Sequence, residues 1–387
     1  MSKKYLIRTF GCQQNTADSE RIATSYEARG FSPTEAVSEA DVIVINTCMV
    51  RDQAEEKVYG FVRNIREGEG KPDAEIVVTG CLVGVALREP SGKMRKKIAS
   101  RLQEVTLLPI DEVGFENHPK RAAGKLASVV IGNGCGNFCS YCIVPFSRGN
   151  EVSRPFQDIQ EEVRGAVKEG RDEILLLGQN VNSYGADFLV DRIREGESYA
   201  LPDGREVTPV MVRHLGKNRI PTLFPYLLEA VATIPGVSKV SFLSSNPWDF
   251  SDELISVIAR NATIDRTLHL PVQAGSDRVL ATMNRWYTRD EYLALVEKIR
   301  AAVPDVSFTT DIIVGFPGET EADFEDTLDI ARRVKFHKAY VARYSPRPGT
   351  ASAKLTDDVS REEKVRRFRE LDRLVLTLAG RGHLLEK

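Results

Sequence analysis

Three cysteines within eight residues constrain this chain more than any other feature of its sequence. They stand in Ile131-Gly-Asn-Gly-Cys135-Gly-Asn-Phe-Cys139-Ser-Tyr-Cys142, directly after an apolar run, Leu126–Ile131, that is typical of a strand. The glycines let the backbone wrap closely around a small group. Three thiolates in one loop suit a soft metal ion or an iron–sulfur cluster. They do not suit a disulfide, because an odd set leaves one thiol unpaired.

Two other interpretations of this loop stay open. A zinc knuckle could take its fourth ligand from elsewhere, although zinc sites more often pair two Cys-x-x-Cys knuckles and the sequence holds no second one. The cysteines could also be small core residues. In the cluster interpretation a cubane has four irons, so three cysteines leave one iron open to an outside ligand.

Composition and charge limit the class of protein. The chain has 387 residues, 42% hydrophobic and 28% charged, which is ordinary for a globular protein of two or three domains. A net charge of −2 gives no general basic field, so composition alone does not indicate a nucleic-acid partner. No signal peptide or membrane helix is visible. Six cysteines without export therefore indicate reduced thiols in a cytoplasmic protein.

Residues 1–118 alternate strand and helix. The predicted strands are Tyr5–Phe10, Asp41–Asn46 and Ala74–Thr79, and the predicted helices are Ala17–Arg29 and Arg51–Arg66. This order predicts a small flavodoxin-like domain with a doubly wound parallel sheet.

The other three cysteines each follow one of these strands. Cys12 comes after the first strand, Cys48 after the second and Cys81 after the third. The carboxyl ends of parallel strands meet at the edge where open α/β sheets bind ligands. Three loops then deliver one thiolate each to a common place, which predicts a second cluster. The alternative is three buried structural cysteines, although such cysteines would more often lie inside a strand.

A longer alternation follows a basic link at residues 119–125. Its predicted strands are Leu126–Ile131, Glu173–Leu177, Lys239–Leu243, Arg266–Leu270, Ser307–Val314 and Lys338–Tyr344, with helices at Gln157–Glu169, Phe224–Ile234, Ser251–Arg260, Arg289–Val303 and Glu321–Val334. Six β/α units predict a partial TIM-like barrel over residues 126–356. Residues 184–221 are interpreted as an insertion. Residues 357–387 hold an arginine-rich amphipathic helix, Ser360–Leu378.

The loop at Cys135–Cys142, with an aromatic residue (Tyr141) before its third cysteine, resembles the signature of the radical S-adenosylmethionine (SAM) enzymes. The resemblance implies that Cys135, Cys139 and Cys142 hold a [4Fe-4S] cluster and act as the catalytic residues. The open iron of that cluster would take the amine and carboxylate of SAM. One electron would then break a carbon–sulfur bond and leave a 5′-deoxyadenosyl radical.

The same resemblance implies the cofactor contacts. Those carried over are Tyr141, Gly178, Gln179, Asn180, Ser244 with Ser245, Gln273, and the segments Asp311–Gly315 (with Ile313) and Tyr344–Thr350. Physically these are mostly small or amide-bearing residues at strand ends, suited to hydrogen-bonding a polar cofactor.

A radical SAM barrel preceded by a three-cysteine α/β domain resembles the methylthiotransferases over nearly the whole chain. The segments that carry this resemblance are Thr9–Asn15, Asn46–Arg51, Thr79–Cys81, Arg148–Arg154 and Leu268–Asp277, while Met283–Thr288 and Tyr344–Thr350 point to the MiaB-type branch. That branch adds a methylthio group to C2 of N6-isopentenyladenosine beside the tRNA anticodon. The resemblance implies two [4Fe-4S] clusters, the second on Cys12, Cys48 and Cys81 as the sulfur source, and two SAM molecules. It also implies a tRNA anticodon stem-loop as partner, an electron donor such as flavodoxin or ferredoxin, and a monomer.

The sequence departs from the family pattern at three places. Gln14 and Trp286 stand where the family usually has methionine and glycine, and the given sequence ends at Lys387, where the family continues into an RNA-docking TRAM domain. Either the sequence is truncated or RNA is gripped differently. Six basic residues of the last helix are candidate phosphate contacts or simply a solvated face. They are Arg361, Lys364, Arg366, Arg367, Arg369 and Arg373.

Two further functions stay open at this point. One is a related methylthiotransferase that acts on threonylcarbamoyladenosine in tRNA or on a ribosomal-protein aspartate. The other, from a different class, is a non-catalytic iron–sulfur or zinc scaffold that binds RNA.

Overall fold

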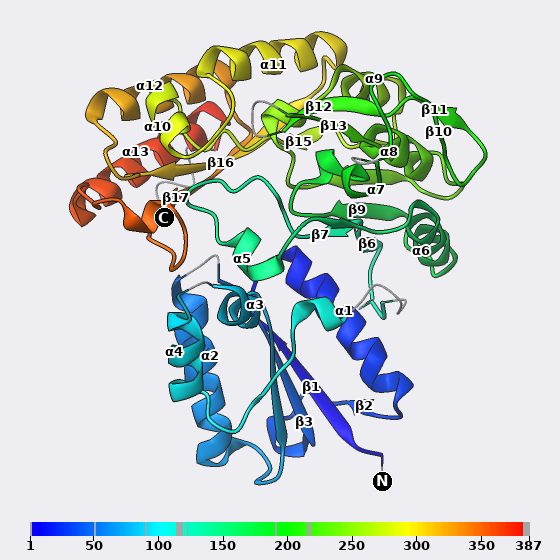
Figure 1. Ribbon diagram of the computed structural model, residues 1–387, viewed down its shortest axis with the longest axis vertical. Helices are drawn as coiled ribbons and strands as arrows, with labels where there is room; N and C mark the ends of the chain where they lie inside the picture. The colour runs from blue at the N-terminus through cyan, green and yellow to red at the C-terminus, as the bar shows by residue number, and fades with distance from the viewer. Residues whose placement is uncertain are drawn as a thin grey trace. The chain divides into compact units, whose positions relative to one another are not determined.

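The computed structural model describes residues 2–49, 52–89, 91–113, 119–121, 123–189, 192–214 and 218–381. These residues form two compact units (Figure 1). Unit 1 comprises residues 1–124, 133–136 and 143–151, and unit 2 comprises residues 125–132, 137–142 and 152–387. The domain boundaries inferred from the sequence stay predictions. Arg51, the predicted start of the second helix, lies outside the described residues.

Unit 1 is built on a five-stranded parallel sheet in the order β2-β1-β3-β4-β5. Its strands are β1 (Lys4–Thr9), β2 (Ser32–Pro33), β3 (Val42–Thr47), β4 (Glu75–Gly80) and β5 (Thr106–Leu107). This is the flavodoxin-like order, so the predicted fold class is confirmed. The pairing aligns Thr9 with Asn46 and Asn46 with Thr79, so β1, β3 and β4 end level with one another.

Helices cover both faces of this sheet. The helices of unit 1 are α1 (Gln13–Ala28), α2 (Asp52–Asn64), α3 (Cys81–Arg88), α4 (Lys93–Arg101) and α5 (Val144–Arg148), with a π-helical turn at Ile65–Glu69 and 3₁₀ turns at Val37–Glu39 and Ile110–Val113. Figure 1 shows α1 on one side of the sheet and α2 and α4 on the other. Ile43 and Ile45 pack toward α2 and α3, whereas Val42 and Val44 pack toward α1. Strand β3 is therefore buried on both faces, as expected for a parallel strand that helices cover on both sides.

Gly84 allows α3 and α5 to touch at their backbones. A Cβ at this position would overlap the carbonyl oxygen of Ser147 on α5. We expect Gly84→Ala to destabilise the protein by about 2–3 kcal/mol, because the two helices must separate. Gly60 in α2 is the matched control: a Cβ there has no atom within 4 Å, so Gly60→Ala should stabilise by up to about 1 kcal/mol through helix propensity. Denaturant unfolding of both variants measures the difference, and equal midpoints would contradict the close contact.

Unit 2 contains two three-stranded parallel sheets, β14-β9-β6 and β15-β16-β17. The strands are β6 (Leu126–Val130), β9 (Glu173–Leu177), β14 (Lys239–Phe242), β15 (Thr267–His269), β16 (Ser307–Val314) and β17 (Lys338–Arg343). A parallel bridge between Val240 and Ile264 joins one sheet to the other. The six strands thus follow one another in chain order as a partial TIM-like barrel. Each predicted strand is present to within one residue at either end.

The helices of unit 2 lie mainly on the outside of these sheets (Figure 1). They are α6 (Phe156–Lys168), α7 (Ala186–Leu189), α8 (Phe224–Ala232), α9 (Asp252–Arg260), α10 (Asp277–Thr282), α11 (Arg289–Ala302), α12 (Glu321–Val334) and α13 (Arg361–Leu378). Capping boxes at Thr288–Glu291 and Thr320–Asp323 fix where α11 and α12 begin. The last helix, α13, packs on β17 and α12 through Leu371 and Val375.

The segment interpreted as an insertion has structure of its own. It contains two antiparallel strand pairs, β10 (Tyr199–Ala200) with β11 (Glu206–Val207) and β12 (Val210–His214) with β13 (Asn218–Thr222). Thr222 anchors the second pair, since its hydroxyl donates to the carbonyl oxygens of Asn182 (2.6 Å) and Tyr184 (3.0 Å). Neither pair was predicted.

Candidate functional site

Cys12, Cys48 and Cys81 lie at one edge of the unit 1 sheet. Cys12 immediately precedes α1, Cys48 follows β3, and Cys81 opens α3 directly after β4. Because β1, β3 and β4 are neighbours, their ends span roughly 10 Å at the usual strand spacing. The edge is also the switch point, where the chain leaves β1 for β2 on one side and β3 lies on the other. Cys48 and Cys81 are buried, whereas Cys12 is exposed.

A buried polar network holds the loops that carry these cysteines. The Asn15 side chain donates to Asn46 Oδ1 (2.8 Å) and to the Thr47 carbonyl oxygen (2.8 Å), and Cys12 Sγ donates to Asn15 Oδ1 (3.2 Å). Thr47 Oγ1 donates across to the carbonyl oxygen of Thr79 (2.5 Å). At Gly80, with φ +87°, a Cβ would overlap both Asn46 and Thr47. The network therefore ties the ends of β1, β3 and β4 together.

Arg148 on α5 is a further buried group of this region; it begins the segment Arg148–Arg154 but was not predicted as a site residue. Its guanidinium donates to Asp18 Oδ2 (2.8 Å) and to Asn133 Oδ1 (3.0 Å), with both partners of the ion pair almost fully buried. Burial opposes the positive charge, but Asp18 and the nearby Cys81 and Cys12 side chains raise the pKa of Arg148 above its ordinary value. The positive charge of Arg148 is therefore buried near Cys81 and Cys12.

The second cysteine group is divided between the units. Cys135 belongs to unit 1, where it is buried and its N–H donates to the Gly149 carbonyl oxygen (3.2 Å). Cys139 and Cys142 belong to unit 2 and form a tight turn, in which the Cys142 N–H donates to the Cys139 carbonyl oxygen (2.9 Å). Ser140, between them, binds the C-terminal end of α10 by donating to the carbonyl oxygens of Met283 (2.9 Å) and Thr282 (2.8 Å).

Arg285 contacts this turn; it lies in the segment Met283–Thr288 but was not predicted as a site residue. Its Nη1 lies 3.6 Å from Cys139 Sγ and 2.9 Å from Asn246 Oδ1, and its Nη2 donates to the Pro271 carbonyl oxygen (2.9 Å). The guanidinium also stacks over Trp248, 4.5 Å from the ring centroid. No local sequence pattern reveals this contact, because Arg285 lies far from Cys139 in the sequence.

The residues expected to contact SAM lie in unit 2, in the cysteine turn or near strand ends. They are Tyr141, Gly178, Gln179, Asn180, Ser244, Gln273 and Ile313. The Val181 N–H donates to the Ser244 carbonyl oxygen (3.3 Å), which brings the loops after β9 and β14 together. Gln273 donates to Asp311 and accepts from Ile313 through backbone groups, both at 2.9 Å. Their role in cofactor binding stays a prediction.

Several buried polar atoms in the same part of unit 2 have no partner within the described residues. They are Asn180 Oδ1, Ser245 Oγ and both side-chain amide atoms of Asn137, in side chains at most 5% exposed. Leaving such an atom unpaired costs about 1–3 kcal/mol. Asn137 is in the cysteine loop, and Asn180 and Ser245 follow β9 and β14. These groups fit a polar ligand bound beside Cys139.

The cysteines do not converge as ligands of a single metal ion. Within the described ranges, no group of three or more His, Cys, Asp or Glu side chains has that arrangement. A four-iron cluster instead takes each thiolate on a different iron, so its cysteines lie farther apart than the ligands of one ion. An all-cysteine donor set fits an iron–sulfur cluster and does not fit a hard cation.

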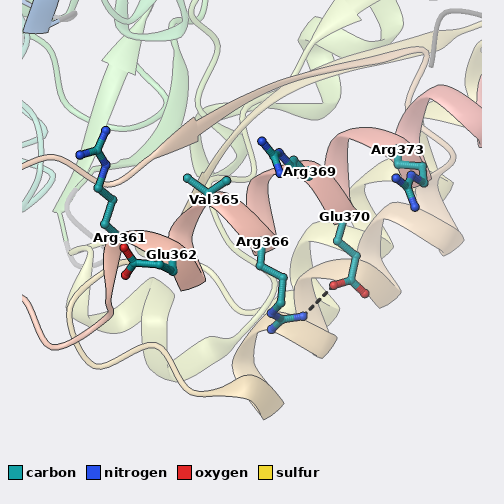
Figure 2. Close-up of a pocket in the computed structure, with 7 residues that line it drawn as sticks. All are labelled: Arg361, Glu362, Val365, Arg366, Arg369, Glu370 and Arg373. Atoms are coloured by element: carbon teal, nitrogen blue, oxygen red, sulfur yellow. Dashed lines mark hydrogen bonds and ion pairs between the residues drawn. The ribbon is translucent and has the colours of Figure 1, made fainter. Parts of the chain in front are cut away.

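Two of the six basic residues of α13 that were candidate phosphate contacts are buried. Lys364 and Arg367 are buried and paired with Asp357 (2.6 Å) and Glu319 (2.8 Å), so neither can contact phosphate. Arg366 pairs with Glu363 and Glu370 and lowers the pKa of Glu363 to about 2. Figure 2 shows the remaining basic side chains along a groove of about 750 Å³, which is lined by Arg361, Glu362, Val365, Arg366, Arg369, Glu370 and Arg373.

Two family models match the chain. Residues 129–331 match the Radical SAM superfamily, and residues 4–99 match a group described as "Uncharacterized protein family UPF0004". The barrel and its cysteine loop thus define a radical SAM protein.

Similar proteins show to which family of radical SAM proteins the chain belongs. The tRNA-2-methylthio-N(6)-dimethylallyladenosine synthase of Thermotoga petrophila is 41% identical over 95% of this chain and 80% of its own length. The synthases of Carboxydothermus hydrogenoformans and Staphylococcus haemolyticus are 42% and 40% identical over 95% and 100% of this chain and over 82% and 72% of their own lengths. The chain belongs to the family of these synthases.

Solved structures support the fold. The radical S-adenosylmethionine methyltransferase TsrM from Kitasatospora setae, with cobalamin and a [4Fe-4S] cluster bound, aligns with a TM-score of 0.60 over 91% of this chain and 77% of that chain. The cobalamin-dependent enzyme OxsB aligns with a TM-score of 0.50 over 97% of this chain and 56% of that chain. Identities of 13% and 8% make these similarities of fold alone.

Proposed function

We propose that this chain is a radical SAM methylthiotransferase that adds a methylthio group to C2 of N6-isopentenyladenosine beside the tRNA anticodon. The observation that carries the proposal is the 41% identity, over 95% of the chain, to a protein named for this product. The placement of Cys12, Cys48 and Cys81 at one sheet edge supports it, because the reaction needs a sulfur source besides the radical-generating centre.

Membership of the radical SAM superfamily implies SAM and one [4Fe-4S] cluster. We assign that cluster to Cys135, Cys139 and Cys142. The second [4Fe-4S] cluster, on Cys12, Cys48 and Cys81, is part of the proposal. It is supported by the placement of three cysteines after neighbouring strands and by the all-thiol donor set.

The chemistry explains why cofactors are required. When bound, the clusters and SAM supply a radical for an aromatic C–H bond that no polar side chain can activate, together with the sulfur and the methyl group of the product. The protein's own residues bind and orient these groups. Asn137, Asn180 and Ser245 offer buried polar atoms to SAM, while the network around Asn15 and Asn46 holds the sulfur-bearing edge rigid.

The proposed partners follow from this reaction. The substrate is the anticodon stem-loop of tRNA, where the target base is already single-stranded and costs little to present. A one-electron donor such as flavodoxin or ferredoxin reduces the cluster, and the protein acts as a monomer in the cytoplasm, where tRNA is modified. Within the described part of the chain, none of the helices has the length and apolar content that a bilayer crossing requires.

Mass spectrometry of tRNA nucleosides tests the proposal. The gene is expressed in a host that lacks its own methylthiotransferase, with the Cys139→Ala variant as the matched control. We expect 2-methylthio-N6-isopentenyladenosine only with the unaltered protein. If an iron-loaded protein leaves isopentenyladenosine unmodified, the proposed substrate is wrong. A 2-methylthio derivative of threonylcarbamoyladenosine would assign the chain to the related tRNA branch instead.

A further inference from the structure

We propose that Arg285 is a positioning residue that holds a fixed positive charge against the sulfur of Cys139 and thereby raises the reduction potential of the cluster bound there. The inference rests on the proposed assignment of a cluster to Cys135, Cys139 and Cys142. It goes beyond that assignment, because it names a residue outside the cysteine loop that controls the electron-accepting property of the site.

The first observation is the geometry of the guanidinium. Arg285 is 6% exposed, and its Nη1 points at Cys139 Sγ from 3.6 Å. An N–H donor at this distance from a sulfur makes the long hydrogen bond that sulfur accepts. Hydrogen bonds and positive charge at the ligand sulfurs are among the factors that set the potential of an iron–sulfur cluster.

The second observation is the absence of another counter-charge. Three other buried arginines, Arg148, Arg154 and Arg367, each pair with a carboxylate at 2.7–2.8 Å. Within the described residues Arg285 pairs with none. Its other partners are the neutral groups of Asn246, Pro271 and Tyr287.

A buried cation without a counter-charge costs several kcal/mol. Among the groups that Arg285 contacts in the described chain, only the Cys139 sulfur becomes anionic when it binds iron. We therefore infer that a ligated Cys139 thiolate supplies the missing negative charge.

The third observation is that the guanidinium is held in place. It stacks 4.5 Å from the Trp248 ring centroid and 5.3 Å from that of Tyr287, and the Tyr287 hydroxyl donates to the Val272 carbonyl oxygen (2.6 Å). The adjoining Asn284 side chain donates to the Phe138 carbonyl oxygen (3.0 Å), next to Cys139. This hydrogen bond joins the residue before Arg285 to the residue before Cys139 and so holds the two segments together. The positive charge therefore does not have to reorganise when an electron arrives.

The expected sign follows from charge. Reduction adds one electron to the cluster and makes it more negative. A nearby cation stabilises the reduced state more than the oxidised state, so it raises the potential. Removing the cation should therefore lower the potential and make the cluster harder to reduce.

The test is a redox titration of the iron-loaded full-length protein, followed by electron paramagnetic resonance. The cluster at Cys139 is identified as the one whose spectrum changes when SAM is added. We expect a lower midpoint potential in Arg285→Gln and a smaller decrease in Arg285→Lys, which keeps the charge but loses the rigid fork. Arg332→Gln, which removes an exposed arginine paired with Glu325, is the control for net charge and should leave the potential unchanged.

Each result decides the proposal. An unchanged potential in an Arg285→Gln protein with full iron content overturns it. If Arg285→Gln fails to retain iron, Arg285→Lys carries the test, because the proposal requires the charge to be fixed at the Cys139 sulfur. A lowered potential in that variant supports the proposal, and an unchanged potential overturns it. The titration needs no tRNA, so it stays informative if the proposed substrate is wrong. A protein without any SAM-responsive cluster would refute the cluster assignment itself.

Discussion

Replacing Cys139 by alanine is expected to abolish cleavage of SAM to 5′-deoxyadenosine, whereas Cys48→Ala should keep cleavage and lose only methylthio transfer. Cys139 lies in the tight turn of the barrel unit, and Cys48 follows β3 at the edge of the other unit. If each site holds its own cluster, losing one thiolate disables the chemistry of that site alone. We expect a loss of cleavage on the order of 10³-fold or more for Cys139→Ala, the scale seen when a unit of catalytic machinery is removed.

Quantifying 5′-deoxyadenosine after chemical reduction measures the first step, and mass spectrometry of tRNA nucleosides measures the second. Ser140→Ala in the same turn is the matched control, because its side chain binds the Thr282 carbonyl oxygen and is not a proposed ligand. Cleavage that survives in Cys139→Ala would mean that the two sites have been assigned the wrong way round. Loss of cleavage in Cys48→Ala would mean that they do not act separately.

The second large effect concerns stability. Asp18→Ala should destabilise the protein by about 3–5 kcal/mol, because it leaves the buried Arg148 guanidinium without its carboxylate. Gln14, whose side chain donates to Asp18 Oδ1 (3.1 Å), also loses a partner. Lys4 and Glu39 form an exposed ion pair in the same unit at 2.7 Å, so Glu39→Ala is the control and should have a much smaller effect.

Denaturant unfolding of the two variants, with matched iron content, measures the difference. The double variant Asp18→Ala/Arg148→Met should recover much of the lost stability, since removing both charges leaves no unpaired buried ion. If Asp18→Ala costs no more than Glu39→Ala, the Asp18–Arg148 pair is not a buried element of the fold.

Much of the scaffold could be predicted because its signals are local. The run Val42–Ile45 is β-branched throughout, and Cys12, Cys48 and Cys81 each follow the end of a strand within three residues. Strand order then follows from the parallel α/β pattern, and with it the meeting of the cysteines at one edge. The short α10 and the two strand pairs of the insertion escaped prediction; β10 and β11 have only two residues each, too few to carry a hydrophobic period.

The charged partners of the site could not be predicted in the same way. Arg285 reaches Cys139 only because the chain after α10 folds back on the cysteine turn, and no local pattern encodes that approach. The same holds for Lys364 and Arg367, whose helical spacing predicted a charged face. Their carboxylate partners, Asp357 and Glu319, precede α13 in the chain and turn two of its cations inward.

The two cysteine groups differ in how much of the chain must be assembled before iron can enter. Cys135, Cys139 and Cys142 are near neighbours in sequence, so little loop-closure entropy separates them. Cys12, Cys48 and Cys81 meet only after β1, β3 and β4 have paired, and such long-range parallel pairing is slow. During biogenesis the sheet edge therefore becomes able to accept the proposed second cluster late. A cell short of iron delivery should accumulate chains in which this edge is the unloaded one.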